Sequence, residues 1–191
     1  MQPAQLLQIL HLAENLKTAT RHSWLSNGRR ESVAEHSWRA ALFACLLAPE
    51  FPGVDQEKLI KMCLFHDMGE AFTGDIPVFE KNESHEQAEA QALAEWTASL
   101  PAPWDTELAA LFQELEEGQT LEARLCHAID KLEVVIQHDE APLSSWIELE
   151  YTLNLTHGSR QVAFSDYLRQ LKDEIDAETR EKIAAGTPTH P

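Results

Sequence analysis

Histidines followed directly by aspartates are the first candidates for chemistry in this sequence. Neutral imidazole is the commonest metal ligand in proteins, and two of the nine histidines precede an aspartate, in His66-Asp67 and His138-Asp139. His66 comes seven residues after Leu59 on the apolar face of a predicted helix, so its ring is expected to point inward. His138-Asp139 lies in a polar run before Pro142 and is predicted to be a solvated helix end. The chemistry is therefore expected at His66 and Asp67.

A cation near the end of that helix could contact both residues. Asp67 projects about 100° around the helix from His66, and an inward carboxylate needs a cation or hydrogen-bond donors because burying it alone costs several kcal/mol. His36 and Asp130 are two further inward polar residues that could complete such a site, although a residue of either kind taken singly is more often a satisfied core residue or a surface group. Glu70 follows His66 by four residues and is expected one turn on along the same face.

The elements that must position these side chains are predicted to be helices nearly throughout. Ser32 and Glu35 form a capping-box pattern that opens one helix, and apolar residues at three- and four-residue steps indicate the others. The segment 21–30 breaks the pattern at the turn signal Ser26-Asn27-Gly28, and no alternating run is long enough to build a sheet. Helices are expected at residues 3–16, 32–47, 55 to between 69 and 74, 83–99, 105–117, 121–139, 144–156 and 161–184.

This pattern predicts an all-α fold, a single globular bundle of about seven to eight helices. One domain is expected over residues 1–185, because the length leaves room for one ordinary core and no linker rich in glycine or serine interrupts it. Residues 186–191 are expected to form a frayed C-terminal tail.

The composition argues against several classes of partner. The chain has 15 Lys+Arg against 32 Asp+Glu and a net charge of −17, which disfavours a nucleic-acid polymer bound through its phosphates. No stretch approaches the roughly 20 apolar residues of a membrane helix, so no membrane partner is expected. The cysteines Cys45, Cys63 and Cys126 form no C-x-x-C pair. We expect a cytoplasmic protein with three buried, reduced thiols.

The order His36, His66-Asp67, Asp130 is the H…HD…D signature of the HD-domain metal-dependent phosphohydrolases, which this sequence resembles from about residue 21 to residue 136 and more loosely to its end. The sequence around these four residues resembles one branch of that family, which hydrolyses deoxyribonucleoside 5′-monophosphates. The resemblance lies in the stretches Glu31–Ser37, His66–Ala71 and Thr73–Pro77. The resemblance implies an HD-domain fold, a metal held by these four residues, and a homodimer. Two imidazoles and two carboxylates suit a divalent ion such as Mn²⁺, Co²⁺, Fe²⁺, Zn²⁺ or Mg²⁺.

The same resemblance implies a set of substrate-binding residues. Arg21 resembles the phosphate-binding arginine of that branch and Trp24 its sugar-facing tryptophan, although the loop that follows is shorter here. Arg29 and Arg30 are alternative phosphate clamps, because a planar guanidinium can bind a phosphate through two hydrogen bonds. Asp75 could accept a hydrogen bond from the sugar 3′-hydroxyl, or it could form the turn between Gly74 and Pro77.

Catalytic roles are predicted for Glu70, Asp67 and Asp75. Glu70 is placed to orient a water molecule or to pass a proton to the leaving alkoxide. The bound metal would supply the attacking water and offset charge on the phosphoryl group.

We therefore expect an HD-domain phosphohydrolase, a metal-dependent phosphomonoesterase that converts (deoxy)ribonucleoside 5′-monophosphates to nucleoside and phosphate. Its partner would be a small nucleotide. One alternative is another HD-type hydrolase, acting on nucleoside triphosphates or removing pyrophosphate from a guanosine alarmone. A second alternative is a non-catalytic helical metal-binding protein. The short chain and the Thr73–Pro77 loop favour the monophosphatase.

Overall fold

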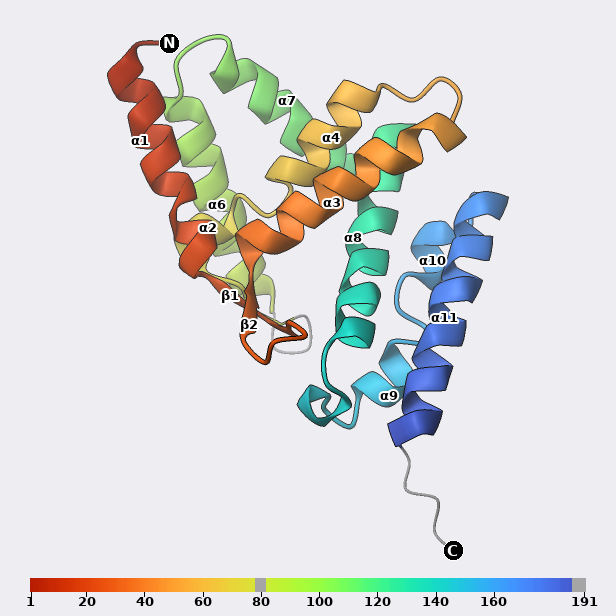
Figure 1. Ribbon diagram of the computed structural model, residues 1–191. Coiled ribbons are helices and arrows are strands. Elements are labelled where there is room, and N and C mark those ends of the chain that lie inside the picture. The colour runs from red at the N-terminus through yellow and green to blue at the C-terminus, as the bar shows by residue number, and fades with distance from the viewer. Residues whose placement is uncertain (78–81, 187–191) are drawn as a thin grey trace, which may run out of the picture.

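The computed structural model describes residues 1–77 and 82–186, and it confirms the expected helical fold (Figure 1). The expected tail beyond Gly186 lies outside the described residues. In chain order the elements are α1 (Pro3–Ala13), α2 (Asn15–Thr18), β1 (Thr20–Trp24), β2 (Arg30–Ser32), α3 (Val33–Leu47), η1 (Ala48–Glu50), α4 (Gln56–Phe65), α5 (Glu70–Thr73), α6 (Glu83–Ser99), α7 (Trp104–Glu117), α8 (Leu121–Glu140), η2 (Leu143–Ser145), α9 (Glu150–Leu153), α10 (Ser159–Val162) and α11 (Asp166–Gly186).

Helix α8 is the centre of the bundle. It contacts α3 and α4 on one side and α10 and α11 on the other, and it also touches α7 and β1 (Figure 1). Its residues Leu125, Ile129 and Leu132 are fully buried at three- and four-residue steps. Full burial of such a side chain contributes about 1.5–3 kcal/mol, so α8 is a rigid platform for the polar residues that project from it.

Local signals place the start of α3 as the sequence predicts. Ser32 Oγ accepts a hydrogen bond from the Glu35 amide at 3.3 Å, and Glu35 Oε2 accepts one from the Ser32 amide at 2.9 Å. This capping box satisfies two of the amides that a helix N-terminus leaves unpaired. It therefore holds His36 in the first turn of α3.

The segment that precedes α3 is a β-hairpin, so the prediction that no sheet forms was wrong. Strands β1 and β2 pair antiparallel, with Thr20 opposite Ser32 and Trp24 opposite Arg30. The strands are five and three residues long, which is too short for a readable alternation of apolar and polar residues. Gln137 Nε2 on α8 also donates to the Trp24 carbonyl at 2.7 Å, a contact that no local pattern reveals.

Helix α4 ends at Phe65, earlier than predicted. The Met68 amide donates to the Phe65 carbonyl at 2.9 Å and the Glu70 amide to the Asp67 carbonyl at 3.0 Å, which are the three-residue steps of tight turns. A separate short helix, α5, then begins at Glu70. The sequence predicted that Glu70 and His66 lie on one helix, and the structure shows that they do not.

The prediction of one continuous helix at 144–156 was also wrong. Trp146 is extended at φ −76° and ψ 139° and separates η2 from α9, and Gly158 at φ +81° separates α9 from α10. The Trp146 indole donates to the carbonyl of His138 at 2.9 Å. This turn-rich segment therefore folds back against the C-terminal end of α8.

Two further findings concern expectations drawn from composition. Cys63 and Cys126 are buried, as expected, but Cys45 is exposed because it lies on the outward face of α3. Among the described residues, no helix combines the length and the apolar character that crossing a membrane requires.

Candidate active site

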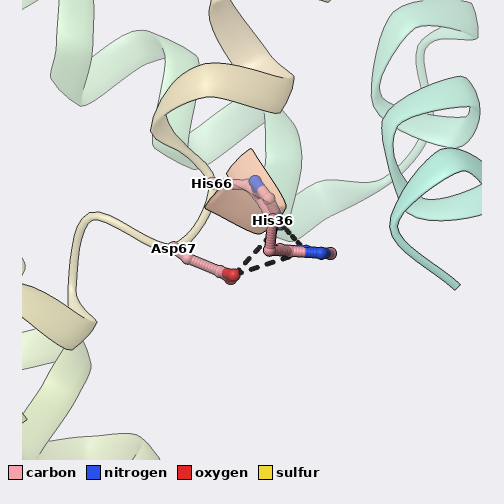
Figure 2. Close-up of side chains that lie close together, drawn as sticks. All are labelled: His36, His66 and Asp67. Carbon is pink, nitrogen blue, oxygen red and sulfur yellow. Dashed lines mark hydrogen bonds and ion pairs between the residues drawn. The ribbon is translucent and has the colours of Figure 1, made fainter. Parts of the chain in front are cut away.

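Four side chains from α3, the end of α4 and α8 converge at one point. The Nε2 atoms of His36 and His66 lie 3.2 Å apart, and Asp67 Oδ2 lies 3.6 Å and 3.3 Å from them, respectively (Figure 2). Asp130 Oδ1, from α8, lies 3.3 Å from His36 Nε2 and 3.9 Å from His66 Nε2. The structure therefore brings together all four predicted metal ligands.

The tautomers of both imidazoles follow from their outer contacts. His66 Nδ1 faces the carbonyl oxygen of Cys63 at 2.9 Å, and His36 Nδ1 faces the carboxylate of Glu133. Both partners are acceptors, so both Nδ1 atoms must donate. With a metal bound, both rings would be neutral and would direct their Nε2 lone pairs at the ion, between the two carboxylates.

This set of converging acceptors fits a divalent ion. Nitrogen and oxygen ligands lie at about 2.0–2.2 Å from such an ion, so neighbouring donor atoms are roughly 3.0–3.6 Å apart, close to the separations found here. Two imidazoles and two carboxylates, without a thiolate, form a borderline donor set that suits several first-row metals. A cation would also relieve the repulsion between the facing lone pairs.

Neighbouring cations keep both predicted carboxylate ligands ionised. Burial alone would raise the pKa of Asp67, but the imidazole of His66 and the guanidinium of Arg21 hold it below its usual value. Burial likewise opposes ionisation of Asp130, whereas Lys131 and His36 hold its pKa well below its usual value. Both side chains are thus in the form that binds a metal.

Glu133 and Arg39 orient His36 from behind, a role that the sequence did not predict. Glu133 is buried on α8 and accepts from both His36 Nδ1 and Arg39 Nε, the latter at 2.6 Å. Carboxylates that accept from the second nitrogen of a metal-binding histidine fix its ring and raise its basicity. The available signal was the position of Glu133, three residues after Asp130 on one helix.

Arg21 reaches the same point from β1. Its Nη1 donates to Asp67 Oδ2 at 3.1 Å, and its Nε lies 3.5 Å from the buried carboxylate of Glu31. The predicted phosphate-binding arginine therefore lies directly beside a predicted metal ligand, where a guanidinium could bind a phosphate oxygen.

Glu70 and Asp75 lie in the same cavity as Arg21 and Asp67. Glu70 is only 8% exposed, and its Oε2 has no hydrogen-bond partner among the residues that the structure describes. Burial, followed by the charges of Asp67 and Asp75, raises the pKa of Glu70 to about 9. The Glu70 carboxyl is thus a buried group that can hold a proton at neutral pH.

Trp24 and Arg30 are engaged with each other instead of with this cavity. The Arg30 guanidinium lies 4.5 Å from the centre of the Trp24 ring and donates to the carbonyls of Arg21 and His22 at 3.3 and 2.7 Å. Neither side chain is among those that line the cavity. Arg29 pairs with Glu35. The structure does not bring these three side chains to the predicted metal ligands.

The cavity has a volume of about 300 Å³, and several of its walls come from residues that the sequence did not single out. Lys131 directly follows Asp130 and lies 2.8 Å from its Oδ2. His138 was predicted to be solvated, but it is buried against Ser23 and Asn154 because the segment after α8 folds back over it. The cavity is lined by Arg21, His22, Ser23, Asp67, Glu70, Asp75, Ile76, Pro77, Asp130, Lys131, Val134, His138, Glu150, Leu153, Asn154 and His157.

A helical fold that aims two imidazoles and two carboxylates at one point, beside an arginine and a buried carboxyl, has the architecture of a metal-dependent hydrolase. A family model described as "HD domain" matches residues 13–172. The chain is 34% identical over 167 residues to the 5′-deoxynucleotidase HDDC2 of Dictyostelium discoideum, covering 80% of this chain and 88% of that protein. It is 30% identical over 189 residues to the Homo sapiens protein of the same name, covering 94% of this chain and 89% of that protein.

Two solved structures have a similar fold over most of their length. A predicted metal-dependent phosphohydrolase from Magnetospirillum magnetotacticum MS-1 superposes with a TM-score of 0.70 at 29% identity, covering 92% of this chain and 93% of that one. The PH0347 protein of Pyrococcus horikoshii OT3 has a TM-score of 0.72 at 27% identity, covering 90% and 99%. The chain belongs to the HD domain family, and it is a hydrolase.

Proposed function

We propose that this enzyme is a metal-dependent phosphomonoesterase that hydrolyses deoxyribonucleoside 5′-monophosphates to nucleoside and phosphate. The observation that carries the proposal is the placement of Arg21, Glu70 and the carboxylates of Asp67 and Asp130 around one cavity. Similarity to two proteins named 5′-deoxynucleotidase, over most of each chain, supports this choice of substrate.

Two cavities reach the predicted metal ligands, and the one of about 300 Å³ suits a phosphate better than the larger one. A cavity of about 1250 Å³ between α6, α7 and α8 also reaches His66, Asp67 and Asp130. Its remaining wall includes four glutamates, Glu83, Glu86, Glu89 and Glu116, whose charge disfavours a phosphate. Arg21 lines only the smaller cavity, so we place the substrate there.

His36, His66, Asp67 and Asp130 would hold the metal, for which we propose Mn²⁺, Co²⁺, Fe²⁺, Zn²⁺ or Mg²⁺. When bound, a divalent ion supplies positive charge to the phosphoryl group and lowers the pKa of water. Arg21 would bind the phosphate oxygens, and Lys131 would add a second positive charge from α8.

In the reaction, water adds to phosphorus and the bond between phosphorus and the 5′-oxygen breaks. The leaving alkoxide needs a proton, which the protonated, buried carboxyl of Glu70 would donate, and the proton that the attacking water loses would restore that carboxyl. Asp75, on the loop after Gly74, would accept a hydrogen bond from the sugar 3′-hydroxyl. Trp24 and Arg30 remain predicted substrate-binding residues, although in this structure they contact each other across the hairpin.

A homodimer is also proposed, and the outer face of α3 supports it. Trp38, Leu42 and Leu46 lie at four-residue steps and are 63%, 43% and 70% exposed. Such a stripe is apolar and uncharged in a chain of net charge −17, and exposed apolar patches commonly mark interfaces. Light scattering of the wild type and of Leu46→Glu tests this: the variant is expected to be monomeric, and a monomeric wild type contradicts the proposal.

The function is tested by phosphate release from a panel of nucleoside mono-, di- and triphosphates, with each candidate metal added in turn. We expect release from deoxyribonucleoside 5′-monophosphates and its loss in Asp67→Ala. Pyrophosphate or tripolyphosphate as the product would instead indicate another HD-type nucleotide hydrolase. Stoichiometric metal binding without turnover of any compound would indicate a non-catalytic metal-binding protein.

A further inference from the structure

The active-site cavity extends along one face of α8, away from the predicted metal ligands. Asp130, Val134 and His138 all line it and are spaced four residues apart, so they lie on one helix face. Eight residues of α-helix span about 12 Å. A nucleotide whose phosphate lies at Asp130 would pass its sugar across the apolar Val134 and carry its base towards His138.

The far end of this cavity is a buried polar cluster. His138 Nε2 lies 3.2 Å from Ser23 Oγ on β1, and its Nδ1 lies 3.0 Å from Asn154 Oδ1 in the turn after α9. Glu150 is also buried, with its Oε1 3.6 Å from His138 Nε2. In Figure 1, α9 lies beside the C-terminal end of α8, so segments far apart in the sequence build this cluster.

The network leaves the side-chain amide nitrogen of Asn154 without a partner among the described residues. His138 Nδ1 faces an amide oxygen, so it donates, and Nε2 of the neutral ring then accepts from the Ser23 hydroxyl. This contact directs Asn154 Oδ1 at the imidazole, and Asn154 Nδ2 has no hydrogen-bond partner in residues 1–77 and 82–186. Asn154 is only 2% exposed. Buried amide groups are nearly always hydrogen-bonded, so this donor indicates a ligand atom.

We propose that Asn154 Nδ2 donates a hydrogen bond to the base of the nucleotide, with His138 holding the amide in position. This inference rests on the proposed function, and it makes the end of α8 the base-binding part of the site. An amide nitrogen with no acceptor beside it suits an acceptor that every base carries, N3 of a purine or O2 of a pyrimidine. The contact therefore positions any base without selecting among the four.

Asn154→Asp is the sharpest test. It keeps an oxygen for His138 Nδ1 and removes the Nδ2 donor. Asn82→Asp is the matched control, because Asn82 caps α6 through its Oδ1, outside the cavity, and aspartate caps a helix equally well. The two substrates are a deoxyribonucleoside 5′-monophosphate and 2-deoxyribose 5-phosphate, which lacks the base.

In Asn154→Asp we expect KM for the nucleotide to rise about five- to tenfold, the effect of one lost hydrogen bond, while KM for 2-deoxyribose 5-phosphate changes less than twofold. Asn154→Ala should do the same, and Asn82→Asp should match the wild type. An equal change for both substrates, or no change for the nucleotide, would overturn the proposal.

Calorimetry separates this inference from the proposed function. Wild-type protein without added metal is titrated with a deoxyribonucleoside, and Asn154→Asp should bind it about five- to tenfold more weakly. A wild type that releases phosphate from neither substrate refutes the proposed function, and this titration still decides the base contact. If both Asn154 variants fail to fold, NMR of the wild type decides: the Asn154 side-chain amide signals should shift when the deoxyribonucleoside is added, and unchanged signals contradict the proposal.

Discussion

The two His-Asp dipeptides of this chain have the same composition and different surroundings. His66 and Asp67 follow the last residue of α4, and both side chains point at His36 (Figure 2). His138 and Asp139 lie inside α8, which continues to Glu140. His138 contacts Ser23 and Asn154 in the cavity, whereas Asp139 accepts from Thr179 on α11 at 2.6 Å.

The difference shows that the end of a helix can decide whether two adjacent side chains act together. Consecutive residues of a regular helix point about 100° apart, so His138 and Asp139 contact different neighbours. His66 and Asp67 lie beyond the last residue of α4, where His66 Nε2 and Asp67 Oδ2 approach to 3.3 Å, so one ion could contact both. The first dipeptide is built for a cation, and the second for a hydrogen-bond network and a helix contact.

The largest effect is expected where the first dipeptide is changed. Asp67→Asn removes the charge of a predicted ligand beside two imidazoles and Arg21. We expect phosphate release to fall by at least about 10³-fold, because the metal supplies most of the electrostatic stabilisation, and metal content measured by mass spectrometry to fall with it. Asp139→Asn, the same change in the second dipeptide, should leave both unchanged. Equal losses in the two variants would contradict the comparison.

The second-largest effect is expected on kcat, through the transfer of a proton to the leaving alkoxide. Glu70→Gln keeps the shape of a buried side chain but cannot transfer a proton, so kcat is expected to fall about 10²- to 10³-fold with metal content unchanged. Steady-state kinetics with a nucleoside monophosphate measures this, and Glu178→Gln, on the exposed face of α11, is the control. Full turnover in Glu70→Gln with metal bound would refute the assignment.

A smaller effect, on metal affinity, is expected when Glu133, the hydrogen-bond partner of His36 Nδ1, is changed. Glu133→Gln weakens the acceptor of His36 Nδ1, and loss of such an outer contact lowers metal affinity about 10- to 100-fold. Glu140→Gln is a close control, because Glu140 pairs with the same Arg39 at the protein surface. Competition with a metal chelator measures both affinities. If the two variants bind metal equally, then Glu133 does not orient the imidazole.

The smallest effect is on stability at the second dipeptide. Burial raises the pKa of Asp139 from the usual 3.8 to about 6. The folded state therefore binds this proton more tightly than the unfolded state, so the contribution of Asp139 to stability is present below pH 3.8 and is lost as the pH rises through 6. Because Asp139 is only half-buried, we expect the free energy of unfolding of the wild type to drop by about 1 kcal/mol more than that of Asp139→Asn between pH 5 and pH 8. Urea denaturation at both pH values measures this, with Asp173→Asn as the control; parallel pH profiles would contradict it.

The sequence alone determined the helices whose signals are local. The capping box at Ser32 and Glu35 placed the start of α3, and Gly118, in the left-handed region at φ +61°, ends α7 as expected. The residue types of the predicted ligands could also be named in advance, because an inward histidine or aspartate is costly unless it has a partner.

Only the tertiary structure decided which of those residues meet, and what lies opposite them. His36 and Glu133 are 97 positions apart in the sequence, and Ser23 and His138 are 115 apart. The contact of the β-hairpin with α8 and the burial of His138 both depend on such distant segments. Capping and periodicity act over a few residues, whereas burial and hydrogen bonding between distant segments arise only when the helices pack around α8.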